Sequence, residues 1–292
     1  MRENKSGGLQ RGANAGRPGA GQTPLTAREL KARFDAALSV AAEAGQLARS
    51  FLAEPRRLQI ASKGPQDIVT AADLAVERLI VQNLTRLFPG DAFLAEETYT
   101  QTSSETLRAL WVIDPIDGTG NFAGGRSDWC VSIGFMHLGK PVIGVIDIPA
   151  AHEQYAALRG GGATLNGKPM RTSDCASLAQ ATLAVDYSYR HSSAAYLEIL
   201  QALFDKKSGF RCNGSSAVSL AHVACGRFDG FVELHLYPWD VMAGIVLIQE
   251  AGGWASDFLG QGGLRRGGPI IAAGAGIQAE LTALLEKIVG KT

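Results

Sequence analysis

Two aspartates, Asp114 and Asp117, stand three residues apart in the string DPIDGTGNF (residues 114–122), directly after the apolar run of residues 110–113. An apolar run that ends at Asp-Pro predicts a buried strand opening into a tight loop, because proline fixes its own φ and favours an extended residue before it. Carboxylates on a stiff turn suit a hard cation such as Mg²⁺, and Gly118 and Gly120 let the backbone approach a phosphate. The alternative is ordinary turn chemistry, which selects the same residue types.

Three further acidic segments, with four acidic residues in all, are candidates for the same chemistry. Asp240 lies in PWDVMAG (residues 238–244), ahead of an apolar run that ends in glycine, and we expect it to be the N-cap of a helix. Asp73 stands three residues after Thr70, as in a capping box. The pair Glu96-Glu97 follows a short predicted strand at residues 91–95. Helix capping or simple solvation would also account for each of these acids.

The strings resemble the signatures of the inositol monophosphatase family. Residues 114–122 match every fixed position of the first signature, Asp-Pro-(Ile/Leu)-Asp-Gly-Thr-x-Asn-(Phe/Tyr). Residues 239–244 match the second, Trp-Asp-x-Ala-(Ala/Gly)-Gly, except that Met242 replaces a small residue. The family also carries Asp-x-Val-Thr-x-x-Asp, as in residues 67–73, and a Glu-Glu pair before the first signature. The resemblance spans about residues 26–285.

This resemblance implies a site for two to three Mg²⁺ ions. The implied metal ligands are Glu96, Asp114, Ile116 through its carbonyl, Asp117 and Asp240. One ion would be shared by Glu96, Asp114 and Ile116, a second by the three aspartates, and a third, weaker ion would lie near Glu96 and Asp73 through water. Without cations, carboxylates gathered in one pocket would repel one another and raise each other's pKa.

The resemblance also implies direct hydrolysis with no covalent phosphoenzyme. The implied catalytic residues are Thr119, Asp73 and Glu96: Thr119, oriented by Asp73, would position a metal-activated water, and a second ion would stabilise the leaving alkoxide. The implied substrate contacts are Asp117, Gly118, Thr119, Gly214, Ser216, Glu233 and Asp240. The amides of Gly118 and Thr119 would hold phosphate oxygens, and Glu233 would bind substrate hydroxyls. A solvated acid at a strand end is the alternative for Glu233.

Two helices are predicted before the first signature. Thr26 and Glu29 form a capping box ahead of apolar residues at helical spacing, and this helix ends at Glu54-Pro55. A polar connection through residues 63–65 leads to a second helix, which Thr70 caps and Pro89-Gly90 ends.

The remaining chain predicts an antiparallel meander followed by alternating helices and strands. The meander consists of residues 129–137, 141–148 and 154–158, with a turn at 166–167 beyond it, and the later elements are helices at 197–204 and 216–225 and a strand at 231–236. Helices that alternate with a mostly antiparallel sheet predict an α+β layered fold rather than a doubly wound one. The resemblance specifies a layered αβαβα sandwich of the inositol monophosphatase and fructose-1,6-bisphosphatase type.

Composition limits what this site can belong to. The chain has 292 residues, 46% of them hydrophobic, with 28 basic and 28 acidic residues, so no overall field attracts nucleic acid or membrane. No apolar stretch reaches transmembrane length. Four widely spaced cysteines without a secretory signal indicate reduced thiols and a cytoplasmic protein. We expect residues 1–25 to be a disordered leader and residues 26–292 a single phosphatase domain with packed halves at about 26–170 and 171–292.

Taken with the resemblance, the sequence predicts a Mg²⁺-dependent phosphomonoesterase acting on a small polyol phosphate, with inositol 1-phosphate as the first expectation, and the resemblance implies that lithium inhibits it. Histidinol phosphate is the nearest alternative substrate, followed by fructose 1,6-bisphosphate and a 3′-phosphoadenosine nucleotide, because one fold hosts related activities. A regulatory binder of RNA or of the transcription machinery is the alternative of a different class. The resemblance also favours a homodimer.

Overall fold

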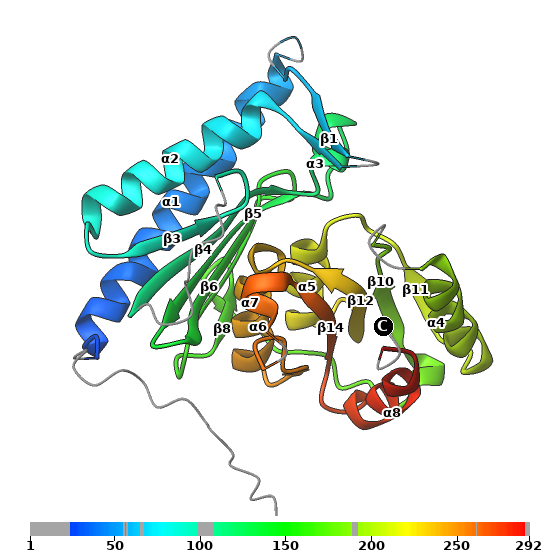
Figure 1. Ribbon diagram of the computed structural model, residues 1–292. Helices are drawn as coiled ribbons and strands as arrows, with labels where there is room; N and C mark the ends of the chain where they lie inside the picture. Colours follow the sequence, from blue (N-terminus) through cyan, green and yellow to red (C-terminus); the bar gives the residue numbers. More distant parts are fainter. Residues whose placement is uncertain are drawn as a thin grey trace, which may run out of the picture.

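A computed structural model of the protein describes residues 24–54, 56, 58–64, 67–98, 108–188, 192–260 and 262–289. Two sheets alternate with three helical layers in the described residues, so the predicted αβαβα sandwich is confirmed (Figure 1). The predicted leader up to residue 23 lies outside the described residues. Packing begins at Leu25, whose side chain is buried and whose N–H donates to Nε2 of His137 at 3.0 Å.

The first helical layer consists of α1 (Ala27–Ala53) and α2 (Ala71–Leu87). Both predicted capping boxes are present: Thr26 with Glu29 begins α1, and Thr70 with Asp73 begins α2. The apolar faces of these helices pack on one side of the first sheet, around the fully buried Trp111 of that sheet. This layer fixes Asp73 against the end of the sheet where the first signature lies.

The first sheet is a seven-stranded sheet in the order β3-β4-β5-β6-β7-β8-β9. Its strands are β3 (Ala92–Ala95), β4 (Ala109–Asp117), β5 (Cys130–His137), β6 (Lys140–Ile148), β7 (Glu153–Leu158), β8 (Ala163–Leu165) and β9 (Lys168–Pro169). Strands β3 and β4 are parallel and every later pair is antiparallel, which confirms the predicted meander. The turn at 166–167 has positive φ at both residues, as expected for Asn-Gly.

The middle layer consists of α5 (Ser216–Ala224) and α6 (Pro238–Glu250), which lie between the two sheets. Gly134 and Gly144 face each other on β5 and β6, directly beneath α6. A Cβ built on Gly134 would lie 2.9 Å from Cβ of Met242, and one on Gly144 would lie 2.2 Å from the carbonyl oxygen of Ala243. Gly134 therefore makes the room for Met242, the residue that departs from the second signature.

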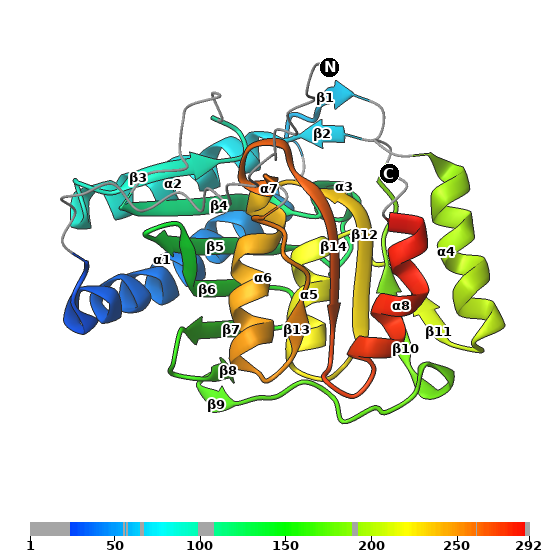
Figure 2. The same ribbon diagram turned by 60° about the horizontal axis from the view of Figure 1, so that its bottom comes forward.

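The second sheet has five strands in the order β11-β10-β12-β14-β13. Its strands are β10 (Thr182–Val185), β11 (Gly209–Arg211), β12 (Gly230–Leu236), β13 (Trp254–Ala255) and β14 (Gly268–Ala273). Strand β10 is parallel to both β11 and β12, whereas β14 is antiparallel to its neighbours. The outer layer, α4 (Ser193–Asp205) and α8 (Gln278–Val289), lies against this sheet, as both ribbon views show (Figure 2).

The remaining elements are short. They are the hairpin β1 (Ala61–Gly64) and β2 (Asp67–Val69), α3 (Thr119–Ala123), the 3₁₀ helix η2 (Leu178–Gln180) and α7 (Gly263–Arg266). The hairpin corrects the predicted polar connection: a mostly exposed strand such as β1 carries no apolar alternation from which a sequence could predict it.

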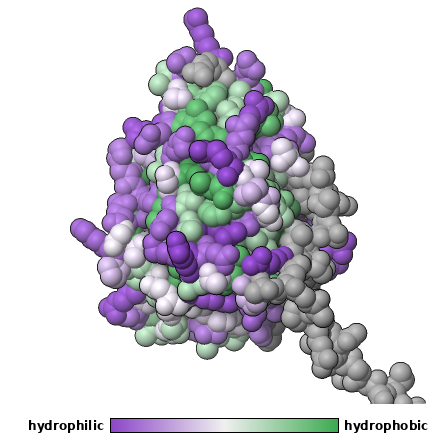
Figure 3. Space-filling model, turned by 90° about the vertical axis from the view of Figure 1, so that its left-hand side faces the viewer, coloured by the Kyte–Doolittle hydropathy of each residue, from purple (hydrophilic) through white to green (hydrophobic). Residues whose placement is uncertain are grey.

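The surface mixes polar and apolar side chains. On the face seen from the left of Figure 1, apolar side chains gather in a central band bordered by polar ones (Figure 3). No helix among the described residues is long and apolar enough to cross a membrane.

Candidate metal centre

Strand β4 delivers Asp114 and Asp117. The strand continues through the Asp-Pro-Ile-Asp segment to Asp117, so the prediction that it opens into a loop at Asp114 is wrong. Pairing with β5 shifts register between Asp114, opposite Ser132, and Asp117, opposite Cys130. Such a bulge tolerates Pro115, which has no N–H to give to the ladder, and it redirects side chains at the strand end.

Helix α6 delivers Asp240. The expectation that Asp240 is the N-cap is wrong, because the helix begins at Pro238 and its N-cap is Tyr237. Asp240 instead occupies the third helical position, where its Oδ2 accepts the N–H of Tyr237 at 2.7 Å. The proline at the first helical position was the sequence signal for the earlier start.

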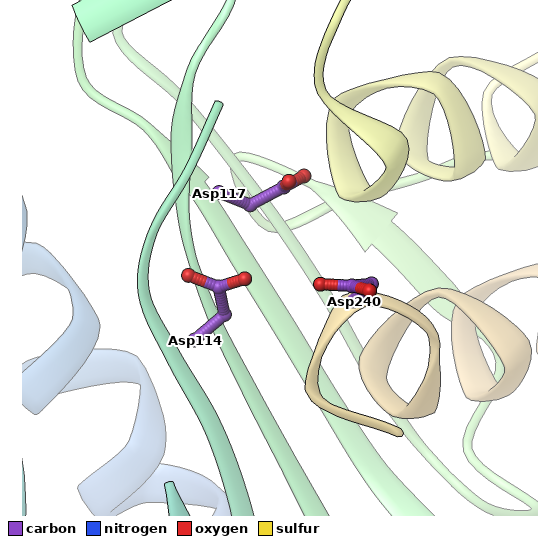
Figure 4. A group of neighbouring side chains, drawn as sticks. All are labelled: Asp114, Asp117 and Asp240. Atoms are coloured by element: carbon purple, nitrogen blue, oxygen red, sulfur yellow. The ribbon is translucent and has the colours of Figure 1, made fainter. Parts of the chain in front are cut away.

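The three aspartates converge on one small space between β4 and the beginning of α6 (Figure 4). One carboxylate oxygen of each lies within 4.8 Å of the others, and among the described residues they form the one such group of acidic, histidine or cysteine side chains. Asp114 is only 2% exposed. Asp117 and Asp240, which are 123 positions apart in the chain, thus meet in space.

Burial and mutual repulsion raise the pKa values of these carboxyls. The pKa of Asp114 lies well above its usual value because of burial, and then because of the charges of Glu96, Asp117 and Asp240. The pKa of Asp240 is likewise raised well above its usual value by burial, then by Asp117 and Glu96. Burial raises the pKa of Asp117 to about 6, although its hydrogen bonds oppose the shift.

Carboxylates this close together and largely shielded from water need a positive charge or a proton between them. Their donor atoms are all oxygens, the ligand type that hard divalent cations prefer. The residues present therefore fit a cation site. The main-chain carbonyl of Ile116 lies between the two β4 aspartates in the chain, and the N–H of Ile116 donates to Oδ1 of Asp114 at 3.0 Å.

Glu96 approaches this trio from the end of β3 but lies outside the group of oxygens within 4.8 Å. Lys63 of β1 bridges it to its neighbour, with Nζ 3.1 Å from Glu96 and 2.6 Å from Glu97. Burial raises the pKa of Glu96 to about 7, which the charge of Lys63 opposes and that of Glu97 reinforces. The contact with Lys63 is one that sequence reasoning missed, because nothing in residues 63–65 points to an acid 33 positions away.

Asp73 serves both as a helix cap and as a partner of the first signature. Its Oδ2 accepts the N–H and the hydroxyl of Thr70 at 2.8 and 2.6 Å. Its Oδ1 lies 3.1 Å from Oγ1 of Thr119, which is also 3.0 Å from the carbonyl oxygen of Ile116. Asp73 has no exposed surface, and burial raises its pKa. Asp73 therefore caps α2, as predicted, and also contacts Thr119 of the first signature.

The start of α5 approaches Asp117 from the other half of the protein. The hydroxyl of Ser215, its N-cap, and the N–H of Ala217 each donate to Oδ2 of Asp117 at 2.6 Å. Gly118 follows with φ +89°, and a Cβ there would lie 2.9 Å from the carbonyl oxygen of Asp128. Sequence reasoning missed the bonds from Ser215 and Ala217 to Asp117, since they join residues about 100 positions apart.

Glu233 lies beside this cluster rather than in solvent. It is 6% exposed, and its Oε2 accepts the hydroxyl of Ser216 at 2.8 Å. Burial, followed by the charge of Asp186, raises its pKa well above the usual value. Gly214, just before Ser215, has φ +72°, which favours glycine. The solvated alternative for Glu233 is therefore excluded, and the candidate residues of the substrate side lie next to those of the metal side.

Comparisons with known proteins agree with this geometry. The sequence model of the inositol monophosphatase family matches residues 29–290. Inositol-1-monophosphatase of Rhizobium meliloti is 37% identical over 243 residues, 82% of this chain and 91% of that protein. Nus factor SuhB of Pseudomonas aeruginosa is 36% identical over 248 residues, 83% of this chain and 92% of that protein.

Solved structures of similar proteins have the same fold. The extragenic suppressor protein suhB of Bartonella henselae superposes with a TM-score of 0.81 at 33% identity, covering 88% of this chain and 99% of that one. An inositol monophosphatase from Anabaena superposes with a TM-score of 0.77 at 33% identity, covering 88% and 96%.

Proposed function

The chain belongs to the inositol monophosphatase family and is a phosphoric monoester hydrolase, and we propose that it hydrolyses a small polyol phosphate, most simply inositol 1-phosphate, with the help of Mg²⁺. The observation that carries this proposal is the trio formed by the buried Asp114 with Asp117 and the half-buried Asp240, in which one carboxylate oxygen of each lies within 4.8 Å of the others. Such a site is costly to bury unless cations neutralise it.

Two to three Mg²⁺ ions would be held by this trio together with Glu96 and the main-chain carbonyl of Ile116. When bound, such cations supply the positive charge that lowers the pKa of a nucleophilic water and stabilises a leaving alkoxide. Hydrogen bonds within the protein orient these ligands. Ser215 and Ala217 donate to the carboxylate of Asp117, and Tyr237 donates to that of Asp240.

The attacking water would be positioned by Thr119 with Asp73. When the hydroxyl of Thr119 donates to Asp73, its lone pairs remain able to accept a proton of a water molecule. Asp73 is held rigidly by Thr70 at the start of α2, so the hydroxyl has a fixed direction. Glu96, with its raised pKa, would be the third catalytic residue.

The phosphate and the alcohol would occupy two sides of the same space. The amides of Gly118 and Thr119, where α3 begins, would hold phosphate oxygens. The alcohol would face Glu233, Ser216 and Gly214, which lie at the start of α5 and on β12. A buried carboxylate beside a hydroxyl suits a substrate that carries hydroxyl groups of its own.

The proposal is tested by measuring phosphate release from inositol 1-phosphate, histidinol phosphate, fructose 1,6-bisphosphate and a 3′-phosphoadenosine nucleotide at saturating Mg²⁺. We expect the highest kcat/KM with inositol 1-phosphate. A clear preference for another of these esters would replace that substrate while leaving the reaction class in place. Phosphate release from none of them would contradict the proposed substrate class.

The second candidate function is binding to RNA or to the transcription machinery. It is motivated by similar proteins that are named Nus factor SuhB. The complete set of acidic residues favours hydrolysis, because a binding role alone gives no reason to keep mutually repelling buried carboxylates. An RNA-binding titration at physiological salt, with wild type and with Asp114→Asn, separates the two: binding that survives the substitution would assign a role independent of the metal centre. We also propose that the protein is cytoplasmic, because its cysteines are widely spaced, and that it is a homodimer, because of the family resemblance. Light scattering can test the oligomeric state.

A further inference from the structure

A buried acid outside both signatures, Asp186, lies directly after β10. It is 5% exposed. Its Oδ1 accepts the backbone N–H groups of Asn213 and Gly214 at 2.8 and 3.0 Å, and its Oδ2 accepts the hydroxyl of Ser219 at 3.1 Å. Because both oxygens already accept hydrogen bonds from the chain, Asp186 is placed to hold a piece of backbone rather than to touch a substrate.

Asn213 and Gly214, whose N–H groups Asp186 binds, directly precede residues of the candidate site. Gly214, with φ +72°, turns the chain into Ser215, whose hydroxyl donates to Asp117. The next residue, Ser216, donates to Glu233. The same turn is tied to α3, since Nδ2 of Asn121 donates to the carbonyl oxygen of Asn213 at 2.7 Å. Residues 213–216 therefore contact Asp117 of the metal centre, Glu233 where the alcohol would bind, and α3, which begins where the phosphate would bind.

Sheet geometry puts Asp186 and Glu233 on the same side of the second sheet. Strands β10 and β12 are parallel, and Val185 pairs with Val232. The residues that follow this pair, Asp186 and Glu233, therefore point to the same side of the sheet. Helix α5 covers both acids: Ser216 donates to Glu233, and Ser219, three positions later on the same helix face, donates to Asp186. The turn at residues 213–216 is thus held from two neighbouring strands.

We propose that Asp186 is a positioning residue for hydrolysis, which fixes the turn at residues 213–216 so that Ser215 and Ser216 meet Asp117 and Glu233. The proposal rests on the proposed function for its substrate comparison only. A carboxylate that accepts two adjacent backbone N–H groups restricts both peptide units, and such charged hydrogen bonds are among the stronger ones in proteins.

Two substitutions at Asp186 separate its geometry from its charge. Asp186→Asn keeps an oxygen that can accept both N–H groups and an amide that can donate to Ser219, so kcat/KM should stay within about threefold of wild type. Asp186→Ala removes every acceptor, and kcat/KM for inositol 1-phosphate should fall about ten- to hundredfold. The loss with p-nitrophenyl phosphate should be smaller, because an aryl phosphate does not depend on Ser216 and Glu233.

Backbone hydrogen exchange, measured by NMR on the full chain, reads the proposed contact without any substrate. The amide hydrogens of Asn213 and Gly214 should exchange at least about tenfold faster in Asp186→Ala than in wild type and should recover most of their protection in Asp186→Asn. If the alanine variant does not fold, Asp186→Ser takes its place, since a serine leaves a small polar group that cannot reach both amides.

Asp229, which contacts the first residue of β10, is a matched control. Its Oδ2 accepts the N–H of Thr182 at 2.7 Å and its Oδ1 accepts the hydroxyl of Ser173 at 2.5 Å, and neither partner belongs to residues 213–216. Asp229→Ala should lower the Tm and leave the ratio of the two kcat/KM values unchanged. Equal changes in that ratio for both alanine variants, unchanged exchange in Asp186→Ala, or an asparagine variant as impaired as the alanine variant would overturn the proposal.

The two proposals fail in different ways. If wild type does not prefer a polyol phosphate, the substrate assignment fails, while hydrogen exchange and turnover of p-nitrophenyl phosphate still decide the role of Asp186. If wild type prefers the polyol phosphate and Asp186→Ala keeps both its exchange protection and its preference, the role of Asp186 alone is refuted.

Discussion

Asp240→Asn should raise the Tm of the metal-free protein at pH 8 and should raise it by less at pH 5. The asparagine oxygen can still accept the N–H of Tyr237, so α6 keeps its capping interaction. The substitution removes a charge from a carboxyl whose pKa is raised well above its usual value by burial, Asp117 and Glu96. Because the folded state holds that proton more tightly than the unfolded state, the wild-type residue costs stability as pH rises from the unfolded pKa through the folded one.

The size of this effect follows from the spacing of the carboxylates. One oxygen of each aspartate lies within 4.8 Å of the others, and two unit charges at that distance repel by roughly 3 kcal/mol at an effective dielectric constant near 20. Partial protonation of the cluster reduces this repulsion, so we expect a gain of about 1–3 kcal/mol at pH 8, or about 2–4 °C in Tm for each kcal/mol. At pH 5, only about one unit above the ordinary aspartate pKa of about 3.9, just part of this penalty has accumulated, so the two proteins differ less than at pH 8.

Thermal melts in excess chelator at pH 5 and pH 8, repeated with Mg²⁺, test this prediction. With Mg²⁺ the order at pH 8 should reverse, because ions that bind only the folded state stabilise it and the variant binds them less well. Glu29→Gln is the matched control: Glu29 occupies the same helical position in α1, away from the cluster, and its pKa is lowered by hydrogen bonds to Thr26. That control should lower the Tm slightly at pH 8. A lower Tm for Asp240→Asn in chelator at pH 8 would refute the repulsion argument.

Three further predictions concern the substrate side, the protons of the site and the N-terminus. Glu233→Gln should reduce kcat/KM by the equivalent of about 1–3 kcal/mol with a polyol phosphate and hardly at all with an aryl phosphate; equal losses would remove Glu233 from the substrate contacts. Mg²⁺ affinity should rise from pH 5 to pH 8, because the pKa of Asp117 is raised to about 6 and that of Glu96 to about 7, so binding must displace protons; calorimetry in two buffers of different ionisation enthalpy would detect their release, and identical heats would contradict it. Deleting residues 1–23 should leave the Tm and turnover unchanged, whereas extending the deletion through Leu25 should lower the Tm, because Leu25 is buried and bonded to His137; a loss of Tm in the shorter deletion would show that the leader packs on the body.

Local signals in the sequence predicted the elements well. The capping boxes at Thr26 and Thr70 mark both first helices at the residue where each begins, because capping is encoded within four consecutive positions. The apolar runs of the meander likewise appear as β5, β6 and β7. Asp114, Asp117 and Asp240 were named as neighbours through the family resemblance, and the folded chain brings them together.

Features that depend on tertiary contacts were less predictable. The bulge that carries Pro115 within β4 is defined by pairing with β5, whereas Asp-Pro by itself predicts a loop. The bridge from Lys63 to Glu96 and the bonds from Ser215 to Asp117 join distant segments, so no local pattern announces them. Asp186 was missed for the same reason: its partners lie 27 to 33 positions away.

The central claim is that the buried carboxylates act through divalent cations to hydrolyse a phosphate monoester. Phosphate release from inositol 1-phosphate by metal-stripped protein, followed during titration with Mg²⁺, tests it most directly, with Asp114→Asn as the paired variant. We expect no release in chelator, full recovery with Mg²⁺, inhibition by Ca²⁺, whose looser coordination fits the site poorly, and almost no turnover by the variant at any Mg²⁺ concentration. Undiminished release in excess chelator, or by Asp114→Asn, would contradict the account.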